Sequence, residues 1–346
     1  MRMNMPVYDE RPFDKSETAV IHDGQKQLVH DPPEIRGPDG SPAQSVDRGD
    51  QVWTWSADEH LTGFAVWREM IWEIYSYREL LGQLVLRDIR IRYKQAIMGF
   101  AWALLMPLLI VAAGCLVKIA LAHASGGNVD LPRVAGMSIK ALGWAFFAGS
   151  IGFAANSLVS NMALVTKVYF PRELFPFSAV ITQWIDTCVG GGFLLVLLAF
   201  FANISISVEW LWAVPVVLLL VAMTTTVALL FSCANVFFRD VKYIVQIVLT
   251  FGIFFTPVFY EPELFGPHGS FIMMLNPLSP ILEALRLAII EKHNLLLPVI
   301  TEGHDGLRFT TWHIGFLIYS AVISLGGFLW AWRYFHKMEF VFAEYV

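Results

Sequence analysis

Charged residues are scarce in this chain. Asp, Glu, Lys and Arg together make up 15% of its 346 residues, whereas about 25% is usual for a soluble domain. Hydrophobic residues make up 56%, including 12 Trp and 27 Phe, and the mean hydropathy is +0.56. This balance excludes an ordinary soluble domain. It predicts an all-α protein that crosses a membrane several times, with aromatic belts at the interfaces and no nucleic-acid partner.

Sequence patterns of metal binding and catalysis are lacking as well. The three cysteines, Cys115, Cys188 and Cys233, each lie in an apolar run and form no C-x-x-C pair. Neither a structural disulfide nor a zinc site is therefore expected. The dipeptide Gly-Lys never occurs, which excludes a G-x-x-x-x-G-K-[ST] phosphate loop. H-E-x-x-H and D-x-D are also missing, so an integral-membrane glycosyltransferase is only a remote alternative.

The apolar runs predict six transmembrane helices. A helix needs about 20 apolar residues to cross the hydrocarbon core of a bilayer. The runs that reach or approach this length lie at 100–122, 141–164, 178–202, 210–233, 244–260 and 311–333. We expect three regions: a disordered cytoplasmic tail at 1–58, amphipathic interface helices at 59–98 and the transmembrane domain at 99–346.

A seventh apolar stretch, residues 271–290, is interrupted by polar and helix-breaking residues. A full span would place these groups in lipid at high cost. We therefore expect two short re-entrant helices, since irregular backbone is tolerated where protein buries it. A peripheral surface helix is the alternative. The interrupting residues are Asn276, Pro277, Pro280, Glu283 and Arg286.

The distribution of Lys and Arg predicts the orientation. Basic residues precede the first expected span and follow the second, fourth and sixth, whereas the opposite loops carry only Arg133 and Lys140 before a longer mixed stretch. Both termini should therefore be cytoplasmic.

The segment before the first span is predicted to be an amphipathic helix in the cytoplasmic interface. At 100° per residue, Glu79, Gln83, Arg87, Arg90 and Lys94 share one face. Asp88 and Arg92 interrupt the apolar side, and their i, i+4 spacing predicts that they pair. A simple membrane anchor fits the same pattern. However, Met98-Gly99 joins this helix directly to the first span, and a glycine there suits a gate.

Residues 165–177, VTKVYFPRELFPF, form an unusually crowded loop between two spans. Aromatic side chains suit an apolar pocket on a partner, and the charged ones suit polar contacts at its rim. Pro171 permits a helix to begin there. Composition alone leaves two interpretations open, a docking loop and an aromatic loop at the membrane boundary. The docking candidates are Lys167, Tyr169, Phe170, Pro171, Arg172 and Glu173.

One acidic residue lies deep in a span. Asp186 is about 13 Å into the third expected helix at 1.5 Å per residue. An acid at that depth faces protein or water. Contact with a translocation path and a packing role beside Gly190-Gly191-Gly192 are both open, and packing is favoured slightly.

Four stretches in order resemble the membrane subunits of ABC transporters that export polysaccharides, a group within the ABC-2 type permeases that handles O-antigen, capsule and teichoic acid. The resemblance covers residues 75–346, although Met98 stands where the family usually has Leu and the N-terminal tail is unusually long. The stretches are LVLRDIRIRYKQAIMGFAWALLMPLL, LVTKVYFPRELFPFSAV, NVFFRDVKYIVQIVLTFGIFFTPVFY and LNPLSPILEALR.

The resemblance implies a function and its partners. Such proteins are homodimers in the bacterial cytoplasmic (inner) membrane, in contact with membrane lipids, and they pass a lipid-linked polysaccharide. Two copies of a separate cytoplasmic ATPase drive them, so ATP and Mg²⁺ would be bound by that partner and no cofactor by this chain. The loop at 165–177 would be the coupling helix that docks on the ATPase.

The resemblance also suggests roles for individual residues. Arg87, Arg90, Arg92 and Lys94 are candidates for the carrier phosphate, since Arg suits bidentate phosphate contact, or for lipid headgroups. Candidates for the channel lining are Trp102, Trp144, Phe146 and Phe147, whose rings could stack on sugars. An ABC-2 exporter of a drug or small lipid is the main alternative. A secondary transporter is disfavoured, because the chain shows one buried acid and no repeat.

Overall fold

The computed structural model describes residues 21–22, 25–26, 64–94, 101–125, 131–162, 164, 170–201, 207–302 and 308–342. Four of the candidate site residues lie outside these ranges: Met98, Gly99, Lys167 and Tyr169.

The chain divides into two units, Met1–Leu61 and Thr62–Val346. The described part of the first unit is a pair of antiparallel two-residue strands, β1 (Ile21–His22) and β2 (Gln25–Lys26). The described part of the second unit is helical apart from loops and one hairpin. Its elements are α1 (Phe64–Ser76), α2 (Arg78–Lys94), α3 (Ala101–Ser125), α4 (Leu131–Ser160), α6 (Leu174–Phe201), η1 (Val208–Trp212), α7 (Ala213–Phe237), α8 (Val241–Phe255), η2 (Pro262–Phe265), α9 (Gly266–Met274), α10 (Leu278–Ile289), β3 (Val299–Glu302), β4 (Arg308–Trp312) and α11 (Ile314–Phe342).

The fold is that of a mostly helical membrane protein. Within the described ranges, four helices are long and apolar enough to cross a bilayer: Pro132–Ser160, Leu174–Phe200, Val208–Phe237 and Ile314–Glu339. α3 and α8 coincide with the first and fifth expected spans, but α8 has only 15 residues. At 1.5 Å per residue it covers about 22 Å, less than the roughly 30 Å of a hydrocarbon core. The count of six spans therefore stays a prediction.

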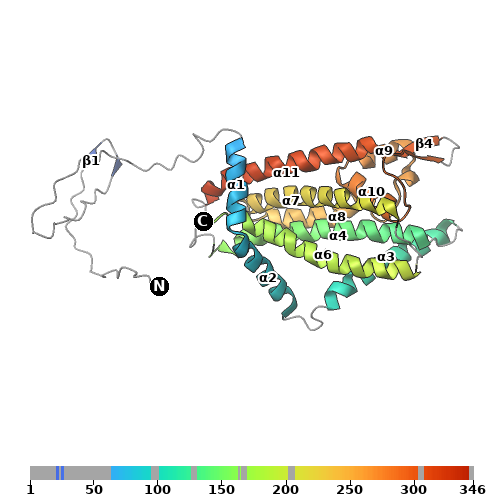
Figure 1. The fold of residues 1–346 in the computed structure, drawn as a ribbon, viewed down its shortest axis with the longest axis horizontal. Helices are drawn as coiled ribbons and strands as arrows, with labels where there is room; N and C mark the ends of the chain where they lie inside the picture. Colours follow the sequence, from blue (N-terminus) through green and yellow to red (C-terminus); the bar gives the residue numbers. More distant parts are fainter. Residues whose placement is uncertain are drawn as a thin grey trace, which may run out of the picture. The chain divides into compact units, whose positions relative to one another are not determined.

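The long helices pack around α7. This helix contacts α4 on one side and α11 on another, and α4 also packs against α6 and α8. In Figure 1 the four long helices run alongside one another, and α1 crosses one end of them. Two apolar cores result. The larger one surrounds α4, α7 and α10, and the smaller one joins α1 to the ends of α6, α7 and α11.

One boundary of the expected spans was wrong. Lys140 was counted as a loop cation, but α4 begins at Leu131 and Lys140 is fully buried inside it. The charge misled the assignment because a buried lysine is rare unless it is paired. Its partner lies in α10, far away in sequence.

The break in residues 271–290 is confirmed in detail. α9 ends at Met274, and the side-chain oxygen of Asn276 accepts a bond from the backbone N–H of Leu278 at 3.2 Å, at the start of α10. Pro277 precedes α10 and Pro280 lies in its first turn, where a missing N–H costs nothing. Every residue of α10 is buried, so α10 is not a peripheral surface helix. Its re-entry into the membrane stays a prediction.

A small hairpin was not expected from the sequence. β3 and β4 pair antiparallel just before α11. The indole N–H of Trp312, at the end of β4, donates to the carbonyl of Leu295 at 3.0 Å and anchors the hairpin to the loop after α10.

Candidate functional site

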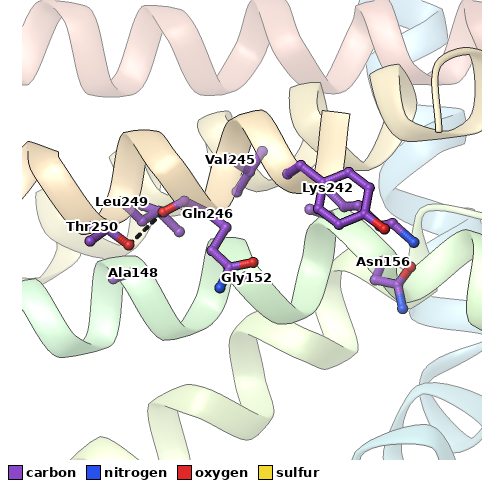
Figure 2. A pocket seen from close by; sticks show the side chains of 10 residues that line it. Ala148, Gly152, Asn156, Lys242, Val245, Gln246, Leu249 and Thr250 are labelled. Atoms are coloured by element: carbon purple, nitrogen blue, oxygen red, sulfur yellow. Dashed lines mark hydrogen bonds between the residues drawn. The ribbon is translucent and has the colours of Figure 1, made fainter. Parts of the chain in front are cut away.

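A groove of about 590 Å³ runs between α4 and α8. On the α4 side, Ala148, Gly152 and Ala155 follow each other about one turn apart. Their small side chains leave room that a larger residue would fill, and Figure 2 shows the hollow between the two helices. Sequence reasoning missed this groove, because the two helices that form it are far apart in the chain.

The α8 wall of the groove carries a polar stripe. Lys242, Gln246 and Thr250 are four residues apart, so they lie on one face of the helix. The Thr250 hydroxyl donates to the carbonyl of Gln246 at 2.7 Å, whereas the Gln246 and Asn156 side chains are exposed in the groove. The other exposed side chains of α8 are largely apolar. The i, i+4 spacing of these three polar residues in an otherwise apolar run is the sequence feature that could have indicated a polar face on this helix.

Among the described residues that line the groove, the one charged side chain is at one end. The ammonium group of Lys242 lies 4.8 Å from the ring centroid of Tyr243, and its backbone N–H donates to the Asn235 side chain at 3.2 Å. The groove thus has one cation, beside Asn156 at one end, and further neutral hydrogen-bonding groups along its length. Such an arrangement can bind a molecule with an anionic end and a hydroxyl-rich body.

Three of the four aromatic residues expected to line a channel pack inside the protein. Trp144 and Phe147 pack on each other with ring centroids 5.6 Å apart, and Phe146 packs edge-on against Trp184 at the same distance. All three of the candidates are buried in the larger core. Their rings pack on α4 itself and on α6. Trp102 lies in α3.

Of the basic residues of α2, Arg87 and Arg92 form ion pairs within the protein, whereas Arg90 and Lys94 are exposed. Arg92 forms an ion pair with Asp186 of α6, and the hydroxyl of Tyr93 donates to the same carboxylate at 2.8 Å. The Arg92 guanidinium also lies 4.1 Å from the ring centroid of Phe153. Burial lowers the pKa of Arg92 from its ordinary value, although the nearby charges of Tyr93 and Asp88 act in the opposite direction. These contacts connect α2 to α6 through Asp186.

Asp88 has partners other than Arg92. The guanidinium of Arg87 donates to its carboxylate at 2.8 and 3.0 Å, and the Ser178 hydroxyl does so at 3.3 Å. Arg87 also donates to the Asn161 side chain at 2.7 Å. The expected pairing of Asp88 with Arg92 is replaced by a pair with the adjacent Arg87 and a hydrogen bond from Ser178 of α6. Arg90 and Lys94 keep charged side chains that are accessible for phosphate or headgroups.

The described part of the crowded loop folds back onto α11. Phe170 is buried and packs against Phe175 with centroids 5.5 Å apart, and Pro171 is buried as well. Glu173 is fully buried, and its two carboxylate oxygens accept bonds from Trp332 at 2.9 Å and His336 at 3.1 Å. Arg172 contacts Glu339. Of the described docking candidates, which are Phe170, Pro171, Arg172 and Glu173, only Arg172 has a partly exposed side chain.

The cluster of Glu173, His336 and Glu339 is the one group that could hold a metal ion among the described residues, with ligand atoms within 4.8 Å of one another. Each oxygen of Glu173 already accepts a hydrogen bond, however, and the backbone N–H of Arg172 donates to Glu339 at 2.9 Å. Both carboxylates therefore have hydrogen-bond partners within the protein.

A second charged cluster holds α10 against α4. The ammonium group of Lys140 donates to Glu283 at 3.3 Å and to the carbonyl of Tyr260 at 2.9 Å. Arg286 pairs with Glu283, with its Nε 2.7 Å from the carboxylate, and with Glu291. Glu283 and Arg286, the two charged candidates in the expected re-entrant helices, are thus joined to Lys140 of α4. The sequence alone had placed Lys140 in a loop.

Close packing accompanies this cluster. A Cβ atom added at Gly143 of α4 would lie 2.5 Å from the Leu282 side chain, and one at Gly136 would lie 3.0 Å from the side chain of Arg286. Glu263 lies 3.9 Å from Arg286. Burial, with a smaller contribution from Glu283, raises the pKa of Glu263 to about 6.

Comparisons with known proteins agree with this architecture. The sequence model of the ABC-2 type transporter family matches residues 79–290, which span α2 to α10. An O-antigen export system permease protein RfbA from Myxococcus xanthus is 30% identical over 233 residues, covering 65% of this chain and 85% of that relative. Two proteins of the same name from Klebsiella pneumoniae are 25% and 26% identical and cover 60% of this chain and 79% of each relative. With more than half of its length matched by the family model, the chain belongs to the ABC-2 type transporter family.

Proposed function

We propose that this protein is the permease subunit of an ATP-driven exporter of a lipid-linked polysaccharide of the O-antigen type. The observation that carries the proposal is the match to three O-antigen export permeases over most of their length. The chain would work as a homodimer with two copies of a cytoplasmic ATPase, which bind ATP and Mg²⁺. The sequence itself contains no phosphate loop, which fits a non-enzymatic channel subunit.

The groove between α4 and α8 is our candidate for the wall of the translocation path. Polar side chains that face lipid are costly, so Gln246 and Asn156 are better explained by contact with water or substrate. Amide groups both donate and accept hydrogen bonds, which suits sugar hydroxyls. Lys242 at one end of the groove suits the phosphate of a lipid carrier.

The membrane arrangement that we propose has six spans, α3, α4, α6, α7, α8 and α11, with α9 and α10 re-entrant between the last two. The protein would lie in the bacterial inner membrane with both termini in the cytoplasm. Residues 1–58 would form a cytoplasmic tail, 59–98 the interface helices and 99–346 the transmembrane domain. Accessibility tags test this: tags in the 203–209 loop and near His268 should be reached from outside, whereas tags after Phe170 and at the C-terminus should not. A C-terminus that is labelled from outside would overturn the arrangement.

The function is tested in the bacterium that makes the protein. Deletion of the gene should remove the polysaccharide from the cell surface and leave it inside the cell on its carrier, where glycan staining of fractionated cells detects it. Increased sensitivity to a drug, with normal surface polysaccharide, would instead favour the drug or small-lipid exporter. Purification of the tagged protein should also recover an ATPase, and the permease by itself should not hydrolyse ATP.

The groove is tested with matched variants of α8. Gln246→Ala and Lys242→Ala remove groups that face the groove, and we expect both to reduce export at normal protein amounts. Ile247→Ala is the control, because Ile247 is exposed on the same helix but does not line the groove. Equal export by all three variants would contradict the assignment of the path.

A further inference from the structure

The buried carboxylate just before α6 needs a physical explanation. Glu173 immediately precedes α6 and is completely buried. Removal of a charged carboxylate from water is costly unless it is paired and hydrogen-bonded. A carboxylate beside a helix N-terminus could cap that helix by accepting hydrogen bonds from its first backbone N–H groups. Here both of its oxygens instead accept bonds from α11, at 2.9 Å from the Trp332 indole and 3.1 Å from the His336 ring.

The partners of this segment form one face of α11. Trp332, His336 and Glu339 are separated by four and three residues, so they point in the same direction. Arg172 adds a second connection beside Glu173, because its backbone N–H donates to the Glu339 carboxylate at 2.9 Å and its guanidinium donates to the Glu339 carbonyl. Two consecutive residues before α6 are thus tied to two turns of α11.

Trp332 extends the connection to a third element. Its ring packs edge-on against Trp67 of α1, with centroids 5.7 Å apart, and against Phe177 of α6 at 5.8 Å. The same side chain therefore contacts α1 and α6 with its ring and Glu173 with its N–H. Close-packed interiors transmit displacements instead of absorbing them, so α1, the start of α6 and the end of α11 should move together.

We propose that Glu173 is a positioning residue for energy coupling. Through Trp332 and His336 it makes the segment before α6 and the end of α11 one rigid unit. A displacement that the ATPase imposes on the 165–177 loop then reaches the last span and α1, as well as α6. This inference rests on the proposed function, and it assigns Glu173 a role inside the protein instead of on the docking surface.

The test uses two variants that break the connection and one that breaks a similar bond elsewhere. Glu173→Gln removes the charge and one acceptor, and Trp332→Phe removes the N–H donor while keeping an aromatic ring. The control is Trp312→Phe, because Trp312 is also a buried indole, and its N–H donates at 3.0 Å to the carbonyl of Leu295 in the loop after α10. Each is expressed as the full chain with its ATPase in the native bacterium.

Two quantities are measured for each variant: surface polysaccharide in cells, and ATP hydrolysis by the purified complex. We expect Glu173→Gln and Trp332→Phe to bind the ATPase and hydrolyse ATP, with the ratio of export to hydrolysis lowered about tenfold, the effect of one lost hydrogen bond to a charged group. The double variant should be no worse than the stronger single one, because both break the same connection. Trp312→Phe should keep the normal ratio even if its melting temperature falls.

An unchanged ratio in both Glu173→Gln and Trp332→Phe would overturn the inference. A ratio that falls equally in Trp312→Phe would also overturn it, since the effect would then be a general loss of stability. If Glu173→Gln does not accumulate, Trp332→Phe decides by itself. Absence of polysaccharide export in the wild type would instead refute the proposed function.

Discussion

The ion pair between Lys140 and Glu283 allows a quantitative test of how α10 is held. Both side chains are almost completely buried, and Arg286 binds the other side of the same carboxylate. On its outer side, Arg286 also pairs with the more exposed Glu291 and lies 3.9 Å from Glu263. Neutralising either member of the Lys140–Glu283 pair therefore leaves the other charge buried without this partner.

The two single variants should differ in cost. Removal of one partner from a buried pair costs about 3–5 kcal/mol. Lys140→Met should lie near 3 kcal/mol, the lower end of about 3–5, because Glu283 keeps Arg286. Glu283→Gln should lie near the upper end, about 5 kcal/mol, because Lys140 then keeps only the Tyr260 carbonyl at 2.9 Å.

The double variant Lys140→Met with Glu283→Gln restores the charge balance. The amide oxygen introduced by Glu283→Gln can still accept from Arg286, and the methionine introduced by Lys140→Met fills much of the space of the lysine stem. We expect the double variant to be more stable than Glu283→Gln alone by about 2 kcal/mol, a coupling within the usual range for contacting residues.

Thermal unfolding in detergent, at one scan rate for all proteins, measures these differences. At about 2–3 °C per kcal/mol, Lys140→Met should lower the melting temperature by roughly 6–9 °C and Glu283→Gln by roughly 10–15 °C. A double variant less stable than Glu283→Gln would refute the argument, since it would show that charge balance does not govern this site.

Three further predictions concern other contacts. Asp186→Asn should remove the ion pair with Arg92 and loosen α2, so that trypsin cleaves at Arg90 faster than in the wild type. Asp186→Glu keeps the charge and should be cleaved at nearly the wild-type rate. Equal cleavage of Asp186→Asn and the wild type would show that this ion pair does not hold the helix. Folding raises the pKa of Glu263 from 4.5 to about 6, so the folded protein binds this proton more tightly than the unfolded chain does. The free energy of unfolding should therefore rise by up to about 2 kcal/mol as the pH falls from 7 to 4.5. Glu263→Gln should remove this part of the pH dependence, and an unchanged profile would contradict it. Gly143→Ala should destabilise the protein by about 1–3 kcal/mol through a clash with Leu282, and Leu282→Ala in the same chain should relieve the clash, as double-mutant melting curves would reveal.

The positions of the helices follow largely from the sequence. Runs of apolar side chains must leave water, so hydropathy locates α4, α6, α7 and α11. Asn276-Pro277 marks the break before α10, because Asn caps the next helix and Pro cannot continue the previous one. The lack of a phosphate loop is likewise a property of the chain alone.

The partners of the polar residues were decided only by the tertiary structure. A helical projection places Arg92 on the apolar side of α2, but it cannot say that Asp186 lies opposite. The sequence alone placed Lys140 in a loop, and only the fold shows that it pairs with Glu283 of α10. Glu173 was predicted to contact the ATPase from its loop composition, and only the fold shows that Trp332 and His336 of α11 lie at its carboxylate. Local sequence sets which residues share a face of a helix, whereas the burial of a charge depends on groups from distant segments that compensate it, and only folding brings these together.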